Sequence, residues 1–85
     1  SKKKGNFSMI IETKGLFLGG KNFKSQEGKQ YHTVKFYMIE LQGITEFWVN
    51  EAIYRRYERA EINKELSLKV KLTISQEGHF RAYIQ

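Results

Sequence analysis

Alternation of apolar and polar residues dominates the chain. The clearest example is LSLKVKLTI (66–74), where Leu, Val and Ile occupy one register and Ser, Lys and Thr occupy the other. Successive side chains of a strand point to opposite faces, so this pattern predicts a strand with one buried face. The same reasoning predicts four further strands, at residues 7–18, 30–41, 44–50 and 79–85.

The period of the pattern changes after the third predicted strand. Ile53, Tyr57 and Ala60 recur at helical spacing, Asn50 is a favourable N-cap residue, and Glu51 suits the first turn of a helix. The sequence therefore predicts a short helix over residues 51–60 with one apolar stripe.

Glycine residues divide the first half of the chain. Gly15 interrupts an apolar, β-branched stretch, and a glycine inside a strand often marks a bulge or a sharp bend. The following segment, GGKNFKSQEGK (19–29), is punctuated by glycine and is predicted to be a loop. Gln42 and Gly43 are predicted to form a tight hairpin connection.

The predicted order is strand, strand, strand, helix, strand, strand. A short antiparallel sheet can remove its exposed edges by closing into a barrel. The order predicts a mainly β protein, a five-stranded OB-fold barrel with one short helix between strands three and four. An SH3-like barrel is the alternative, but it usually has only a 3₁₀ turn at the helix position. Residues 1–8 are interpreted either as a flexible basic arm or as residues added before a native start at Met9, and residues 9–85 as a single domain.

Composition narrows the classes of partner. The 85 residues carry a net charge of +6, of which three lysines lie in residues 1–8, and the chain has no Cys. A basic surface suits a polyanionic partner. The absence of Cys fits a reducing cytoplasm, of a bacterium or a phage-infected host cell, and no apolar run approaches the ~20 residues that span a bilayer. We expect no membrane partner.

Catalytic patterns are not found in the sequence. His32 and His79 are far apart in sequence and are interpreted as surface residues. There is no metal-ligand spacing, and the glycine-rich GLFLGG has no Gly-Lys-Ser or Gly-Lys-Thr sequence and does not lead into a helix, as a phosphate-binding loop would. We therefore expect no enzymatic activity, no cofactor and no metal site.

Aromatic and basic residues are interleaved on the strand registers that do not form the core. Flat rings stack on unpaired bases while cations contact phosphates, which is the chemistry that single-stranded nucleic acid requires. The candidate stacking residues are Tyr31, Tyr37, Trp48 and Tyr83. The candidate phosphate contacts are Lys24, Lys29, Lys35, Lys69, Lys71 and Arg81.

The same residues also have structural explanations. Trp48 could close the bottom of the barrel or lie under the helix, and Tyr31 could seal a loop hinge. Tyr54 and Tyr57 are assigned to helix packing, and the pair Arg55–Arg56 to a solvated helix face. The lysines of the fourth strand could simply keep an outer face soluble.

The stretch SQEGKQYHTVKFYMIEL (25–41) resembles the second-strand hairpin of the filamentous-phage single-stranded DNA-binding proteins, where a Gly-Lys-x-Tyr element opens a strand that contacts nucleic acid. The matching residues are Gly28, Lys29 and Tyr31, and the resemblance implies that Lys29 and Tyr31 contact the ligand. Those phage proteins have no comparable helix between strands three and four. EFWVN followed by EAIYRRYER is instead similar to the general bacterial OB-fold group.

These observations predict a non-enzymatic, largely sequence-independent single-stranded DNA-binding protein. We expect it to act in DNA replication, recombination or transfer of a bacteriophage or another mobile element, as a homodimer or higher homo-oligomer. Two alternatives are a protein-interaction OB module using the same aromatic strip and an RNA-binding protein of cold-shock type.

Overall fold

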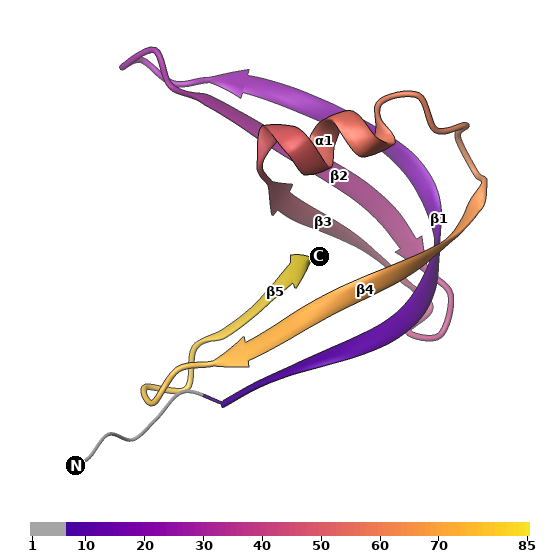
Figure 1. Cartoon of the computed structure of the whole chain (residues 1–85), viewed down its shortest axis with the longest axis vertical. Helices are drawn as coiled ribbons and strands as arrows, with labels where there is room; N and C mark the ends of the chain where they lie inside the picture. Colours follow the sequence, from indigo (N-terminus) through magenta and orange to yellow (C-terminus); the bar gives the residue numbers. More distant parts are fainter. Residues whose placement is uncertain (1–6) are drawn as a thin grey trace.

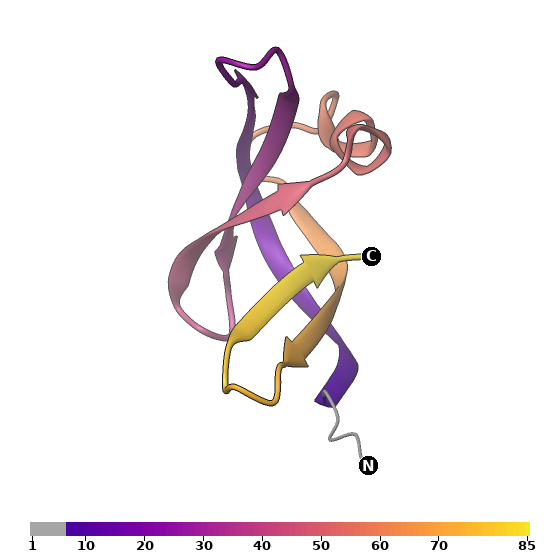
Figure 2. The same ribbon diagram turned by 90° about the vertical axis from the view of Figure 1, so that its left-hand side faces the viewer.

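Five antiparallel strands and one short helix make up the described part of the protein. The computed structural model describes residues 7–85, and the basic residues 1–6 lie outside this range. The sheet curls into a half-barrel, with the helix over one end of it (Figures 1 and 2). The elements are β1 (Phe7–Lys24), β2 (Gln30–Met38), β3 (Gly43–Val49), α1 (Glu51–Tyr57), β4 (Glu65–Ile74) and β5 (Phe80–Ile84).

Strand β1 is shared by the two halves of the sheet, whose strand order is β3-β2-β1-β4-β5. Its first part pairs with β4, from Phe7 opposite Ile74 to Leu16 opposite Glu65. Its second part pairs with β2, and Gly15 lies at the changeover, opposite both Met38 and Leu66. The predictions of five strands, and of a helix between strands three and four, are confirmed.

The glycines of β1 follow the predictions only in part. The register irregularity lies between Phe17 and Gly19, whereas Gly15 lies where β1 changes partner from β4 to β2. Gly15 also allows close packing, since an added Cβ would lie 3.2 Å from Phe36 Cβ. The predicted loop from residue 19 is also largely strand, because β1 continues to Lys24. Gly19 adopts a φ of 124° next to the irregularity, a conformation that glycine adopts at no steric cost.

The loops after β1 and β4 share the sequence SQEG and the same turn. In residues 25–29 the Ser25 amide donates to the Lys29 carbonyl at 2.8 Å, and in residues 75–79 the Ser75 amide donates to the His79 carbonyl at 2.9 Å. The fourth residue of each, Gly28 or Gly78, has a positive φ, as the glycine of a bulged hairpin turn requires. The first loop is therefore only five residues long.

The core is formed by the alternating registers that the sequence marks as apolar. Phe36 is completely buried and contacts three other rings, those of Phe17, Phe47 and Tyr57, at centroid distances of 5.4–6.3 Å. The other buried apolar residues are Val34, Met38, Leu68, Val70 and Ile84. Burying a large apolar side chain stabilises the fold by roughly 1.5–3 kcal/mol.

Helix α1 covers the end of the half-barrel near β2. The Asn50 side chain accepts a hydrogen bond from the Ile53 amide at 2.8 Å, which confirms the predicted N-cap. Tyr57 is buried, and Ile53 and Ala60 pack partly buried against the core. The helix ends at Tyr57, three residues before the predicted end, but the apolar stripe is used as predicted.

The opposite end of the sheet has no such cover. Phe7, Met9, Ile74 and Phe80 continue the core register of β1, β4 and β5 but remain exposed. Phe80 shares the register of the buried Ile84 on β5, yet 62% of its surface is accessible. Phe7 and Ser8, assigned to the basic arm from sequence, already pair with β4. In residues 7–85 no helix has the length and apolar character needed to cross a membrane.

Candidate nucleic-acid interface

Three aromatic rings gather on the outer face of the sheet, near the β1–β2 hairpin. Trp48 lies between Phe23 and Tyr31, with centroid distances of 5.8 and 6.1 Å. Trp48 is 64% exposed, and Phe23 and Tyr31 are 41% and 43% exposed. We call these three residues the aromatic cluster. Its rings come from three adjacent strands and stabilise one another in tilted and edge-on arrangements.

Strand pairing explains how the cluster forms. Phe23 of β1 lies opposite Tyr31 of β2, and Trp48 of β3 lies opposite Thr33, two positions along β2. Residues directly opposite each other on antiparallel strands project from the same face, as do residues two apart on one strand. The outward orientation of Tyr31 and Trp48 predicted from alternation is thus confirmed. Trp48 neither closes the barrel nor lies under α1.

Lysines border the aromatic cluster. Lys21 lies opposite Thr33, two positions before Phe23 on β1, and projects from the same face. Lys29 is the last residue of the hairpin loop and Lys35 lies two positions from Thr33 along β2, whereas Lys24 follows Phe23 and so projects from the opposite face next to the loop. The salt bridges of residues 7–85 involve none of these four lysines. Their charges are available to a partner.

A groove separates β3 from β5, and it brings two further predicted residues toward the cluster. The groove has a volume of about 420 Å³, and Trp48 and Glu46 line it from β3. Arg81 and Tyr83 line it from β5, and Tyr83 is 40% exposed. Both residues are therefore within the surface that a ligand extending from Trp48 would cover.

Other predicted site residues lie farther away. Tyr37 shares the outer face of β2 but lies four positions from Thr33, roughly 13 Å along the strand, and it is half-buried. Lys71 lies opposite Tyr83, one strand beyond the groove. Lys69 lies opposite Glu12, beside the end of β5. The structure does not bring these three residues together with the aromatic cluster.

Glu46 is a carboxylate within this otherwise cationic surface. The Thr33 hydroxyl donates to Glu46 Oε2 at 2.7 Å, and Thr33 is only 2% exposed although alternation predicts an outward, exposed position. Thr33 is covered because it lies between Lys21 and Trp48 of the neighbouring strands. Lys35 is the cross-strand partner of Glu46, yet no cation of the described residues lies within 4.0 Å of this carboxylate.

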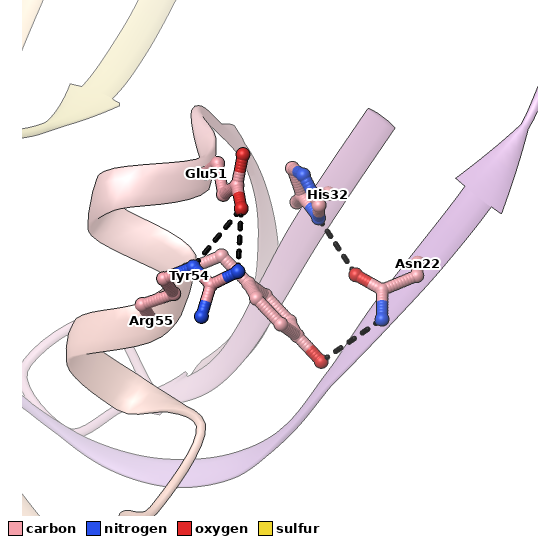
Figure 3. Close-up of polar contacts among 5 residues, drawn as sticks. All are labelled: Asn22, His32, Glu51, Tyr54 and Arg55. Carbon is pink, nitrogen blue, oxygen red and sulfur yellow. Dashed lines mark hydrogen bonds and ion pairs between the residues drawn. The ribbon is translucent and has the colours of Figure 1, made fainter. Parts of the chain in front are cut away.

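A polar network on the other face holds α1 to the hairpin. His32 Nδ1 donates to Asn22 Oδ1 at 2.6 Å, and Asn22 Nδ2 donates to the Tyr54 hydroxyl at 3.3 Å (Figure 3). The Tyr54 ring stacks on His32 at 4.9 Å and would clash with any Cβ at Gly20. His32 is 9% exposed, so its interpretation as a surface residue was wrong.

Helix α1 carries an exposed ion pair beside this network. Arg55 donates two hydrogen bonds to Glu51 Oε2, at 2.9 and 2.7 Å (Figure 3). These bonds and the charge of Arg55 lower the pKa of Glu51 below its usual value, and the same bonds and the charge of Glu51 raise the pKa of Arg55. Arg56 donates to the Gln85 carbonyl at 2.8 Å. The pair stabilises the first turns of α1 and does not contact the aromatic cluster.

Phe23 and Lys21 were missed as site residues. Both fall in the segment that the glycines marked as loop, and a loop gives no register from which to predict a face. The signal that could have found them is the sequence KNFK (21–24) after Gly20, which continues the alternation with Lys21 and Phe23 on one side.

Within residues 7–85, no group of three or more His, Asp or Glu side chains could hold a metal ion. Comparison of the chain with protein-family models, curated proteins and solved structures gives no match. The arrangement of the aromatic cluster, the lysines and the groove is therefore the basis for assigning a function.

Proposed function

We propose that the protein is a non-enzymatic, largely sequence-independent single-stranded DNA-binding protein that acts in replication, recombination or transfer. The observation that supports this most strongly is the aromatic cluster, three partly exposed rings on one sheet face with Lys21, Lys29 and Lys35 beside them. Solvent-exposed aromatic rings with cations around them match the exposed faces and charged backbone of unpaired nucleotides.

We also propose that the sheet is an OB-fold barrel. Three features support this: β1 pairs with both β2 and β4, α1 follows β3, and β3 lies close to β5 across the groove. The strand 2–3 face and the loops after β1 and β4 are the usual ligand sites of that fold. The aromatic cluster lies on this face.

The chemistry favours a single strand over a duplex. Stacking needs a base whose face is free, and the bases of a duplex cover one another. Each base stacked on an aromatic side chain contributes roughly 1–3 kcal/mol, whatever its identity. Lys21, Lys24, Lys29 and Arg81 would neutralise phosphates on either side of Trp48, which makes the affinity sensitive to salt.

Titration of Trp48 fluorescence tests this proposal, because Trp48 is the chain's only tryptophan. Oligo-dT should quench its emission, a duplex of the same length should not, and the affinity should fall with salt at a slope near −0.7 per phosphate contacted. Oligo-rU measures any RNA binding. If oligo-dT gives neither quenching nor retardation at low salt, the proposal fails.

A second candidate is a protein-interaction module that self-associates. The exposed Phe7, Met9, Ile74 and Phe80 support it, because such residues at the open end of a sheet suit a second copy of the chain. Sedimentation velocity of the wild type and of Phe80→Ser tests this candidate. A dimer that persists at high salt and is weakened by the substitution supports it, and a monomer at all concentrations contradicts it.

A further inference from the structure

We propose that Glu46 gives the site a preference for guanine among the bases of a single strand. This inference goes beyond sequence-independent binding and rests on the proposed function. It concerns the one acidic side chain among the residues that line the groove between β3 and β5.

Glu46 lies where it can reach the edge of a base stacked on Trp48. The two residues are two positions apart on β3, roughly 7 Å, and both line the groove. Arg81 and Tyr83 line the opposite side, so a base on Trp48 would have its edge between the two strands. The surface is thus built to contact a base edge as well as a base face.

The carboxylate has free hydrogen-bonding capacity. Thr33 donates one bond, to Oε2, so Oε1 and one further lone pair of Oε2 remain unused by the described side chains. Satisfying the Thr33 hydroxyl needs a single acceptor, which a neutral glutamine would also provide. The negative charge itself disfavours phosphate and lowers the affinity for every strand. A role in base recognition would explain a carboxylate here.

Guanine is the base that matches two free acceptors. Its N1–H and N2–H₂ groups lie side by side on the Watson–Crick edge and can donate to both carboxylate oxygens. Adenine and cytosine present one amino group beside an acceptor nitrogen, and thymine presents one N–H between two carbonyl oxygens that repel a carboxylate. Single-stranded bases are commonly read on this edge, and a good bidentate contact discriminates by about tenfold or more.

Fluorescence anisotropy with labelled oligonucleotides of about 12 nucleotides tests the inference. We expect an alternating dT-dG strand to bind about tenfold tighter than oligo-dT. An alternating dT-dA strand controls for the stronger stacking of purines and should bind nearly like oligo-dT. A strand with hypoxanthine in place of guanine lacks only the N2 amino group and should fall between the two.

Glu46→Gln should bring the ratio of affinities for the dT-dG and dT-dA strands close to one. The same substitution should tighten binding of oligo-dT and of the dT-dA strand, because a negative charge is lost, and should weaken binding of the dT-dG strand, because the bidentate contact is lost. Glu12→Gln removes a charge from an exposed residue of β1 that does not line the groove and should leave the ratio unchanged. Circular dichroism checks that both variants are folded.

The two possible failures are distinguishable. If no single strand binds to the wild type, the proposed function fails. If strands bind but the wild type does not distinguish guanine from adenine, or if Glu46→Gln keeps the wild-type ratio, the inference is overturned while the proposed function stands.

Discussion

The two ends of the curled sheet expose aromatic rings to a similar extent but on opposite faces. Trp48 at the β2–β3 end is 64% exposed and Phe80 at the β4–β5 end is 62% exposed. Trp48 projects from the outer face among lysines, whereas Phe80 belongs to the core register and lies opposite Ile74. The degree of exposure does not distinguish these residues, but their surroundings do.

Helix α1 explains the difference. It covers the core register at the β2 end, where Tyr57 and Ile53 pack against the buried residues (Figure 1). No element of the described chain covers the same register at the β4–β5 end, so Phe7, Met9 and Phe80 stay exposed. We infer that the rings of the aromatic cluster are exposed for binding. The apolar residues at the β4–β5 end are exposed because the sheet extends beyond the part that helix α1 covers.

Substitutions in the core register should give the largest difference in stability between the two ends of the sheet. Phe36→Ala removes a ring with no exposed surface that contacts Phe17, Phe47 and Tyr57, and should lower the free energy of unfolding by about 3–5 kcal/mol. Phe80→Ala should cost less than about 1 kcal/mol, because most of that ring is already in water. Urea denaturation measures both. Equal losses would show that the apolar end is covered in solution.

Breaking the contacts that attach α1 to the hairpin should lower the stability by an intermediate amount. Asn22→Ala removes the acceptor of the His32 ring N–H and the donor to Tyr54. A largely buried donor without a partner costs about 1–3 kcal/mol, so the protein should lose stability by that amount. Amide hydrogen exchange should show faster opening of α1 than in the wild type. Unchanged exchange in α1 would mean that the network does not hold the helix.

Removing the ion pair on α1 should change the stability least, and the change should depend on pH. The hydrogen bonds from Arg55 lower the folded-state pKa of Glu51, so the stabilisation is present above the pKa of the unfolded state. It is lost as the pH falls through the lowered folded-state value. The stability difference between wild type and Glu51→Gln should therefore be largest near neutral pH and shrink in acid. In an Arg55→Met background the difference should become smaller, leaving only the interaction of Glu51 with the N-terminus of α1, and an undiminished difference would contradict this assignment.

The sequence predicted the core of the fold because alternation records which face each strand buries. Val34, Phe36 and Met38 are buried as their register requires, and the helix begins at the residue after Asn50. The sequence could not predict the extension of β1, because consecutive glycines such as Gly19 and Gly20 are typical of turns. In the structure Gly19 lies at the register irregularity, and Gly20 allows the Tyr54 ring to approach the strand closely.

The candidate site was predicted only in part, for a similar reason. Tyr31 and Trp48 were identified by register alone, but their meeting with Phe23 depends on the pairing of β1 with β2. The burial of His32 depends on Tyr54, which lies 22 positions later in the chain. Contacts of this kind are set by tertiary packing, and local alternation carries no information about them.

The most direct test of the account compares Trp48→Ala with Phe80→Ala in binding labelled oligo-dT, measured by fluorescence anisotropy. The two side chains are almost equally exposed, so their removal changes the apolar surface to a similar degree. We predict that Trp48→Ala weakens binding by the 1–3 kcal/mol typical of one stacked base, or about 5- to 150-fold, and that Phe80→Ala leaves it unchanged. Equal affinities of the two variants would contradict the assignment of the aromatic cluster as the binding surface.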